Sequence, residues 1–176
     1  MGINSRFSKN LLLFSGFIII TSSIQGQYYE LASDIFILDK KAPIESFEEL
    51  VEALEGKPFY LDRWATWCSP CIKEFTHSEE LHEFLRASKI EMVYLNSDSE
   101  IEESEWFDFI VKHKLKGHHL RLESSLKSDL ANKGLFIPRI PQYMIVNGQG
   151  EVIDNNALRP SNGEELQMQI RLKLNL

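Results

Sequence analysis

The sequence predicts an α/β protein built around one mixed β-sheet. After residue 33, segments with the apolar pattern of strands alternate with amphipathic helical segments. Residues 90–98 are apolar on both faces, as expected of a central buried strand. Near the C-terminus, Asn147 and Gly148 separate two short strands and predict an antiparallel hairpin. Together these three observations favour a mixed sheet flanked by helices.

The strands share short apolar runs bounded by turn residues. They are predicted at residues 33–40, 57–64, 90–98, 118–122, 142–146 and 151–155. The segment 118–122, which reads HHLRL, is predicted as a short edge strand. Its adjacent histidines, His118 and His119, are expected at the surface.

The helices share apolar residues at helical spacing together with a start or stop signal. They are predicted at residues 46–56, 68–88, 102–117, 124–134 and 161–176. The first two carry apolar stripes, and the first is expected to stop at Gly56. The third is expected to close at Gly117, and the last to begin at a capping residue, Ser161.

Composition indicates one globular domain of ordinary size. Of the 176 residues, 43% are apolar and 26% are charged. With 19 basic and 26 acidic residues, the formal charge is −7, which argues against nucleic acid as a partner. We expect a monomer.

The N-terminus has the order of a secretory signal. Arg6 and Lys9 precede the apolar run 11–20, and small polar residues follow it. The run is about half the length that a membrane-spanning helix needs. We therefore predict a signal peptide over residues 1–26 and a mature domain over 27–176. An uncleaved anchor formed by residues 11–20 is the alternative.

Both cysteines of the chain, Cys68 and Cys71, lie three positions apart. A disulfide across so short a loop stabilises a fold little, because its entropic effect grows with loop length. Cys68 is predicted at the junction of a strand and a helix, where unpaired backbone N–H groups lower the pKa of a thiol. Pro70 suits the first helical turn. This spacing is typical of a reversible dithiol, in which Cys68 attacks and Cys71 resolves the mixed disulfide.

Other uses of the cysteines are disfavoured. A zinc site would need two of the five histidines beside the pair, and their spacing does not supply them. A peroxidase of the peroxiredoxin type needs a Pro, Thr and Cys cluster in one loop, which WATWCSPC lacks. Two residues separate the cysteines here, whereas three separate the cysteines in one class of copper-delivery protein. We expect no metal and no soluble cofactor.

The segment FYLDRWATWCSPCIKEF resembles the active-site segment of the thioredoxin superfamily, with its W-C-x-x-C signature. The dipeptide Ile140-Pro141 matches the cis-proline signature that faces the cysteines in that family. Residues 101–122 resemble the insertion of the TlpA/ResA-like branch, which contains exported thiol–disulfide oxidoreductases. The resemblance implies a thioredoxin fold with a helix-strand insertion after the central strand. It also implies a periplasmic enzyme that reduces disulfide-containing client proteins, with a possible membrane electron donor.

The resemblance also implies roles for single residues. Glu74 matches the active-site glutamate of the TlpA/ResA-like branch, and Asp62 matches the buried aspartate of classical thioredoxins. Either carboxylate could take the proton of the resolving cysteine.

Around the cysteines, Trp67 would shield the pair, and Pro70, Ile140 and Pro141 would contact the client chain. The chain departs from the family at Arg63, where an apolar or aromatic residue is usual, and the sequence offers no account of this cation.

Two alternatives stay open from the sequence. Ser69 replaces the glycine of classical thioredoxins, and residues between the cysteines tune the redox potential. The direction of electron flow is therefore open, and an oxidant or isomerase is an alternative to a reductant. A non-catalytic thioredoxin-like module that only binds client chains is the second alternative.

Overall fold

The computed structural model describes residues 34–176, and the predicted signal peptide, residues 1–26, lies outside them. The strands are β1 (Ile35–Ile37), β2 (Phe59–Trp64), β3 (Glu91–Asn96), β4 (Gly117–Arg121), β5 (Gln142–Val146) and β6 (Val152–Asp154). The α-helices are α2 (Phe47–Ala53), α3 (Ser69–Glu74), α4 (Ser78–Ala87), α5 (Glu103–Lys112), α6 (Ser124–Asn132) and α7 (Glu164–Leu174). Short 3₁₀-helices are η1 (Leu38–Lys40), η2 (Phe75–His77) and η3 (Pro160–Asn162). Within residues 34–176, every helix is too short or too polar to cross a membrane.

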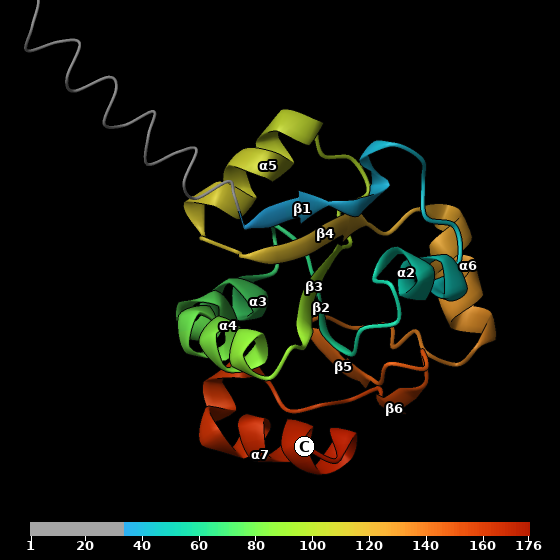
Figure 1. Ribbon diagram of the computed structural model, residues 1–176. Coiled ribbons are helices and arrows are strands. Elements are labelled where there is room, and N and C mark those ends of the chain that lie inside the picture. The colour runs from blue at the N-terminus through green and yellow to red at the C-terminus, as the bar shows by residue number, and fades with distance from the viewer. Residues whose placement is uncertain (1–33) are drawn as a thin grey trace, which may run out of the picture.

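The sheet is mixed, as the sequence predicts. Its strand order is β1-β4-β3-β2-β5-β6 (Figure 1). The first four strands in this order run parallel, whereas β5 pairs antiparallel with β2 and β6 antiparallel with β5. β3 lies near the middle of the sheet and is buried over almost its whole length, which confirms the central strand. The predicted hairpin at Asn147 is confirmed as well.

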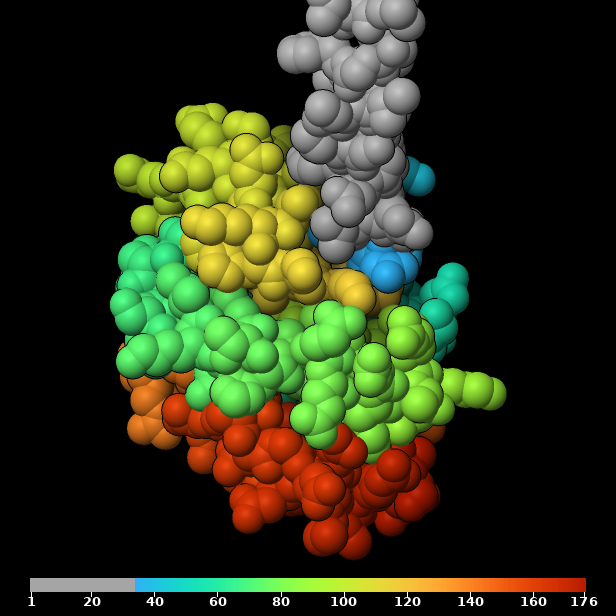
Figure 2. Space-filling view, turned by 90° about the vertical axis from the view of Figure 1, so that its left-hand side faces the viewer, coloured from blue at the N-terminus to red at the C-terminus, as the bar shows by residue number. Residues whose placement is uncertain are grey.

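Helices cover both faces of the sheet, and each face has its own apolar cluster. One cluster joins α4, α5 and α7 to the face that carries Tyr60 and Trp64. The other joins α2 and α6 to the face that carries Phe59 and Leu61. Figure 2 shows α5, α4 and α7 side by side along one flank of the molecule. Because successive residues of β2 alternate between the two clusters, Asp62 and Arg63 must face opposite ways.

The helix-strand insertion is confirmed, but its strand is not at an edge. β4 lies between β3 and β1, and β1 forms the edge of the sheet. The prediction of surface histidines is therefore wrong for His119, which is fully buried and stacks on Tyr94 with ring centroids 4.9 Å apart. His118 is partly buried and pairs with Glu91. β4 was predicted at an edge because its partner β1 lies about eighty residues earlier in the chain, and the sequence does not show that the two strands pair.

The prediction of one long helix over residues 68–88 is wrong. The 3₁₀-helix η2 separates α3 from α4. At this point the Thr76 hydroxyl donates a hydrogen bond to the carbonyl of Lys73, 2.8 Å away. A threonine that bonds back to the preceding turn competes with the regular helical pattern and favours a bend. α3 is therefore a short helix that is separate from α4.

Two helix boundaries also differ from the prediction. Gly117 does not close α5, which ends at Lys112; it begins β4, with φ near +140°. A Cβ atom at Gly117 would lie 2.5 Å from the carbonyl oxygen of Met92, so a glycine is required where β4 meets β3. Ser161 does not cap α7 either, because its side chain bonds elsewhere, as described below.

Buried histidines predict a loss of stability in mild acid. The His82 Nε2 atom lies 2.8 Å from the Tyr94 hydroxyl, and burial lowers the pKa of His82 to about 4. In the unfolded chain a histidine titrates near about 6.5. The stability that this difference supplies is present above about pH 6.5 and is lost as the pH falls toward 4, by up to about 1.4 kcal/mol per pH unit. Urea unfolding at a series of pH values should therefore show a shallower acid loss for His82→Gln. Equal slopes for both proteins would contradict this prediction.

Candidate active site

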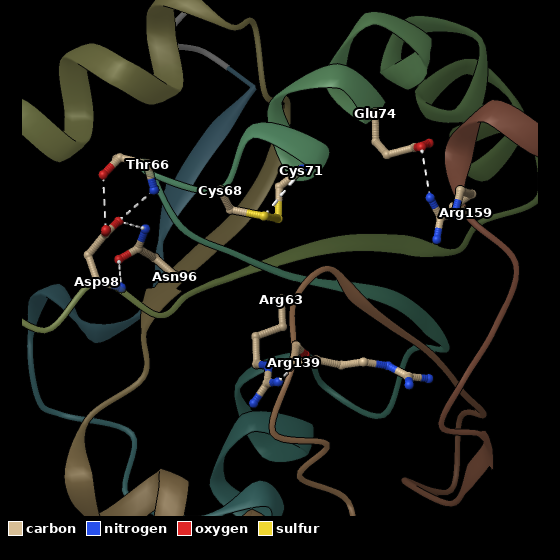
Figure 3. The surroundings of a disulfide bond; sticks show 9 residues. All are labelled: Arg63, Thr66, Cys68, Cys71, Glu74, Asn96, Asp98, Arg139 and Arg159. Carbon is tan, nitrogen blue, oxygen red and sulfur yellow. Dashed lines mark hydrogen bonds and ion pairs between the residues drawn. A yellow bond between two sulfur atoms is a disulfide. The ribbon is translucent and has the colours of Figure 1, made fainter.

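Cys68 and Cys71 lie at the start of α3, shortly after the end of β2, as predicted, and they are joined by a disulfide (Figure 3). Cys68 is the N-cap residue of α3, and its sulfur accepts a hydrogen bond from the backbone N–H of Cys71 at 3.3 Å. Ser69 and Pro70 fill the first turn, where a proline costs no hydrogen bond. After reduction, the backbone N–H groups in the first turn of α3 would favour a thiolate at Cys68.

The surroundings of the pair are asymmetric. Cys71 is fully buried in the apolar cluster beneath α3, and Cys68 is buried in this oxidised state as well. Trp67, directly before Cys68, is 68% exposed and lines an open cavity. The exposed surface next to Cys68 is therefore aromatic, whereas Cys71 is completely enclosed.

Asp98 holds the loop before Cys68 in place. Its carboxylate accepts hydrogen bonds from the backbone N–H and the hydroxyl of Thr66, both at 2.9 Å. The Asn96 side-chain amide donates to the same carboxylate at 2.7 Å. These bonds tie the end of β2 to the loop after β3 and so fix where Cys68 starts α3 (Figure 3).

The Ile140–Pro141 peptide bond is cis, and Pro141 comes directly before β5. β5 pairs antiparallel with β2 in a register that sets Arg63 opposite Gln142. Pro141 therefore lies near the end of β2 from which Cys68 follows. The fold brings the two family signatures, about seventy residues apart in the chain, to one end of the sheet.

Glu74 is buried at the C-terminal end of α3 and is held by the C-terminal segment. Its carboxylate accepts hydrogen bonds from the backbone N–H of Ser161 at 2.9 Å and from the Ser161 hydroxyl at 3.1 Å. Arg159 Nη1 lies 3.6 Å from the same carboxylate (Figure 3). Three groups of the C-terminal segment thus hold the Glu74 carboxylate in place.

Asp62 is also buried, but its environment is the opposite. It is 1% exposed, and neither of its oxygens has a hydrogen-bond partner among the described residues. The strand register sets Tyr94 and Tyr143 on either side of it. Burial first, and the negative charge of Glu74 second, raise the pKa of the Asp62 carboxyl well above its usual range. Such a carboxyl keeps its proton to higher pH than an ordinary aspartate, and once ionised it is a stronger base toward a neighbouring thiol.

Arg63 points away from the cysteines, toward the other face of the sheet (Figure 3). Its Nη2 atom donates hydrogen bonds to the carbonyl of Ile137 and, at 2.7 Å, to the carbonyl of Arg139. Its guanidinium carbon lies 4.1 Å from the centre of the Phe136 ring. The structure thus accounts for this departure from the family: Arg63 supports the segment that leads to Pro141.

Several of these contacts were not predicted from the sequence. Asp98 could have been predicted as a site residue, because it follows a parallel strand and polar residues at the C-terminal ends of such strands often meet at a site. Ser161 and Arg159 carried none, since they lie more than eighty residues from Glu74 in the chain. The sequence does place Asp62, Cys68, Cys71 and Glu74 close together, and the structure brings all four to the same face of β2 and α3.

Comparisons with known proteins agree on one family. The thioredoxin-like family matches residues 56–152. The thiol–disulfide oxidoreductase ResA of Bacillus cereus is 27% identical over 157 residues, which are 82% of this chain and 87% of the relative. A solved structure from Bacteroides vulgatus, assigned as a thiol–disulfide oxidoreductase, is 30% identical with a TM-score of 0.56, over 69% of this chain and 79% of that one. StoA of Bacillus subtilis, at 24% identity and a TM-score of 0.51, covers 64% of this chain and 81% of its own and supports the fold alone.

Proposed function

Because this chain belongs to the thioredoxin-like family, in its TlpA/ResA-like branch, and is a thiol–disulfide oxidoreductase, we propose that it reduces disulfide bonds of exported client proteins. The observation that carries this proposal is the Cys68–Cys71 disulfide at the start of α3, beside the segment of Pro141. A disulfide of this kind is the product that remains when a dithiol has given two electrons to a client.

The proposed reaction has two exchanges. In the reduced protein, the Cys68 thiolate attacks one sulfur of the client disulfide, and the other client sulfur leaves as a thiolate. Cys71, once deprotonated, then attacks the Cys68 sulfur of the mixed disulfide. The Cys68–Cys71 bond forms, and the second client sulfur leaves. The client gains two electrons and two protons, and the protein is oxidised by the same two electrons.

The two carboxylates take different parts in this proposal. Asp62, which has no hydrogen-bond partner among the described residues, accepts in its ionised form the proton that Cys71 must lose, and its raised pKa makes that form a stronger base than an ordinary aspartate. Glu74 is held by Ser161 and Arg159, and its charge contributes to the raised pKa of Asp62. Glu74 thus affects this proton transfer indirectly, because it raises the pKa of Asp62.

Four residues are proposed to receive the client chain. Trp67 and Pro70 lie on either side of Cys68 in the sequence, and Ile140 and Pro141 come directly before β5, which pairs with β2. Trp67 and Ile140 line the same cavity. A client segment that lies across these residues would present its disulfide to Cys68.

The location and the electron source are part of the same proposal. The basic and apolar N-terminal sequence supports export to the periplasm, with residues 1–26 either cleaved or kept as an anchor. Electrons would return to the Cys68–Cys71 pair from a membrane donor by the same dithiol exchange. No soluble cofactor is required.

Titration of the Cys68–Cys71 pair in a glutathione buffer tests the direction of electron flow. We expect a reduction potential near or below about −250 mV, in the range of thioredoxin-like reductants. A value above about −180 mV would assign the protein to the oxidants or isomerases. A pair that does not titrate reversibly would contradict the oxidoreductase itself and favour a client-binding module.

A further inference from the structure

A cavity of about 600 Å³ opens beside the active site. Trp67 and Ile140 form part of its wall, so it lies next to the path that a client chain takes to Cys68. Its remaining wall comes from the loops after β3 and β4, from α6, and from residues 136–139. A client side chain a few residues from the reacting cysteine could enter it.

The floor of this cavity carries a buried cation without a carboxylate partner. Arg63 lines the cavity and is only 2% exposed. Burial lowers the pKa of Arg63 to about 10, so the guanidinium remains charged at neutral pH. Two backbone carbonyls and the Phe136 ring contact it, and its Nε atom has no hydrogen-bond partner among the described residues. Buried cations are usually paired with an anion, because their desolvation is costly.

Two further cations gather at the same place. The Lys127 Nζ atom lies 5.5 Å from the centre of the Phe136 ring, on which Arg63 also stacks. Arg139 lines the cavity as well. Neither these two residues nor Arg63 forms an ion pair within residues 34–176, whereas seven other Lys, Arg or His residues there do.

The only acidic residue in the cavity wall, Asp98, is already engaged by three donors from Thr66 and Asn96. The wall therefore holds three basic side chains against one acidic one, in a chain whose formal charge is −7. A local excess of positive charge on an acidic protein would attract a negatively charged group.

We propose that this cavity binds an acidic side chain, Asp or Glu, that lies near the disulfide of the client. The inference rests on the proposed function, and it adds a preference among clients that the cysteines alone do not provide. Arg63 and Lys127 would attract the carboxylate beside the Phe136 ring. Arg139, two residues before Pro141, would meet it where the client chain passes.

Two model peptides test this proposal. Each contains one intramolecular disulfide, and they differ only in a Glu or a Gln two residues from one cysteine. The reduced full-length protein is mixed with each peptide, and the second-order rate of peptide reduction is measured by quenched flow. Each rate is divided by the rate with dithiothreitol, which has no such cavity, to remove intrinsic differences between the peptides.

We expect the protein to prefer the Glu peptide by about fivefold at low salt, a difference of about 1 kcal/mol. The preference should fall toward one as the salt concentration rises to about 1 M, because salt screens charges. In the double variant Lys127→Gln with Arg139→Gln, both of which replace exposed side chains, the preference should largely disappear.

The matched control is Lys40→Gln with Lys41→Gln, two exposed lysines at η1 that change the net charge by the same amount. This control should keep the preference. Equal rates for the two peptides in the unmodified protein would overturn the inference while leaving the proposed reduction intact. The inference would also be overturned if the variant with Lys127→Gln and Arg139→Gln kept the preference for the Glu peptide. It would be overturned as well if the Lys40 and Lys41 control lost that preference to the same extent. Failure to reduce either peptide would overturn the proposed function as well.

Discussion

Replacing Cys71 with serine should turn the protein from a catalyst into a trap for its clients. Cys68 can still attack a client disulfide, but no internal thiolate then releases the adduct. We expect turnover to stop after about one client per protein molecule, with a mixed disulfide at Cys68. Non-reducing electrophoresis and mass spectrometry of the adduct measure this result.

Cys68→Ser is the matched control for this trap. Cys71 is fully buried, so it should form no adduct with clients. Adducts of similar yield from both variants would show that the assignment of attacking and resolving cysteines is wrong. Client binding by Cys71→Ser without any covalent adduct would instead favour a non-catalytic binding module.

Asp62→Asn should slow the second exchange of the reaction. Cys71 then loses the group that accepts its proton, and general acid–base contributions of this kind are about 10²–10⁴-fold. The first exchange, which depends on the Cys68 thiolate, should change far less. Stopped-flow measurement of the formation and resolution of the mixed disulfide separates the two steps. Equal slowing of both steps would contradict a specific role of Asp62 at Cys71.

The same variant should also stabilise the fold at neutral pH. An aspartate in the unfolded chain loses its proton near about pH 3.9, whereas the raised pKa keeps Asp62 protonated in the folded protein to higher pH. The unmodified protein therefore loses stability as the pH rises from about 4 toward the folded pKa, by up to about 1.4 kcal/mol per pH unit. Urea unfolding should show a stability gap in favour of Asp62→Asn that widens with pH. Asp108→Asn, an exposed substitution on α5, should show no such gap.

The parts of the structure that local sequence determines could be predicted. The buried strand β3 follows from apolar residues on both faces, and the start of α3 follows from Cys68 and Pro70. The interruption at η2 was missed because one threonine, Thr76, bends a segment whose apolar pattern is helical throughout.

The remaining differences come from partners far away in the chain. His119 is buried because β4 lies between β3 and β1 and because the rings of Tyr94 and Trp106 pack against it. Arg63 donates hydrogen bonds to backbone carbonyls 74 and 76 residues away. Every residue has a backbone carbonyl, so the sequence does not indicate which ones an arginine will contact. The same holds for Glu74, whose partner Ser161 lies 87 residues away and resembles an ordinary helix cap. Contacts of this kind depend on the assembled sheet.

The position of β4 inside the sheet also limits how such a protein can change during evolution. Within the described residues, β1 has β4 as its only neighbouring strand. A deletion that removed α5 and β4 would leave β1 without a pairing partner and would uncover the edge of β3. The insertion and the first strand are therefore expected to be inherited together, as one structural unit split between two distant parts of the gene.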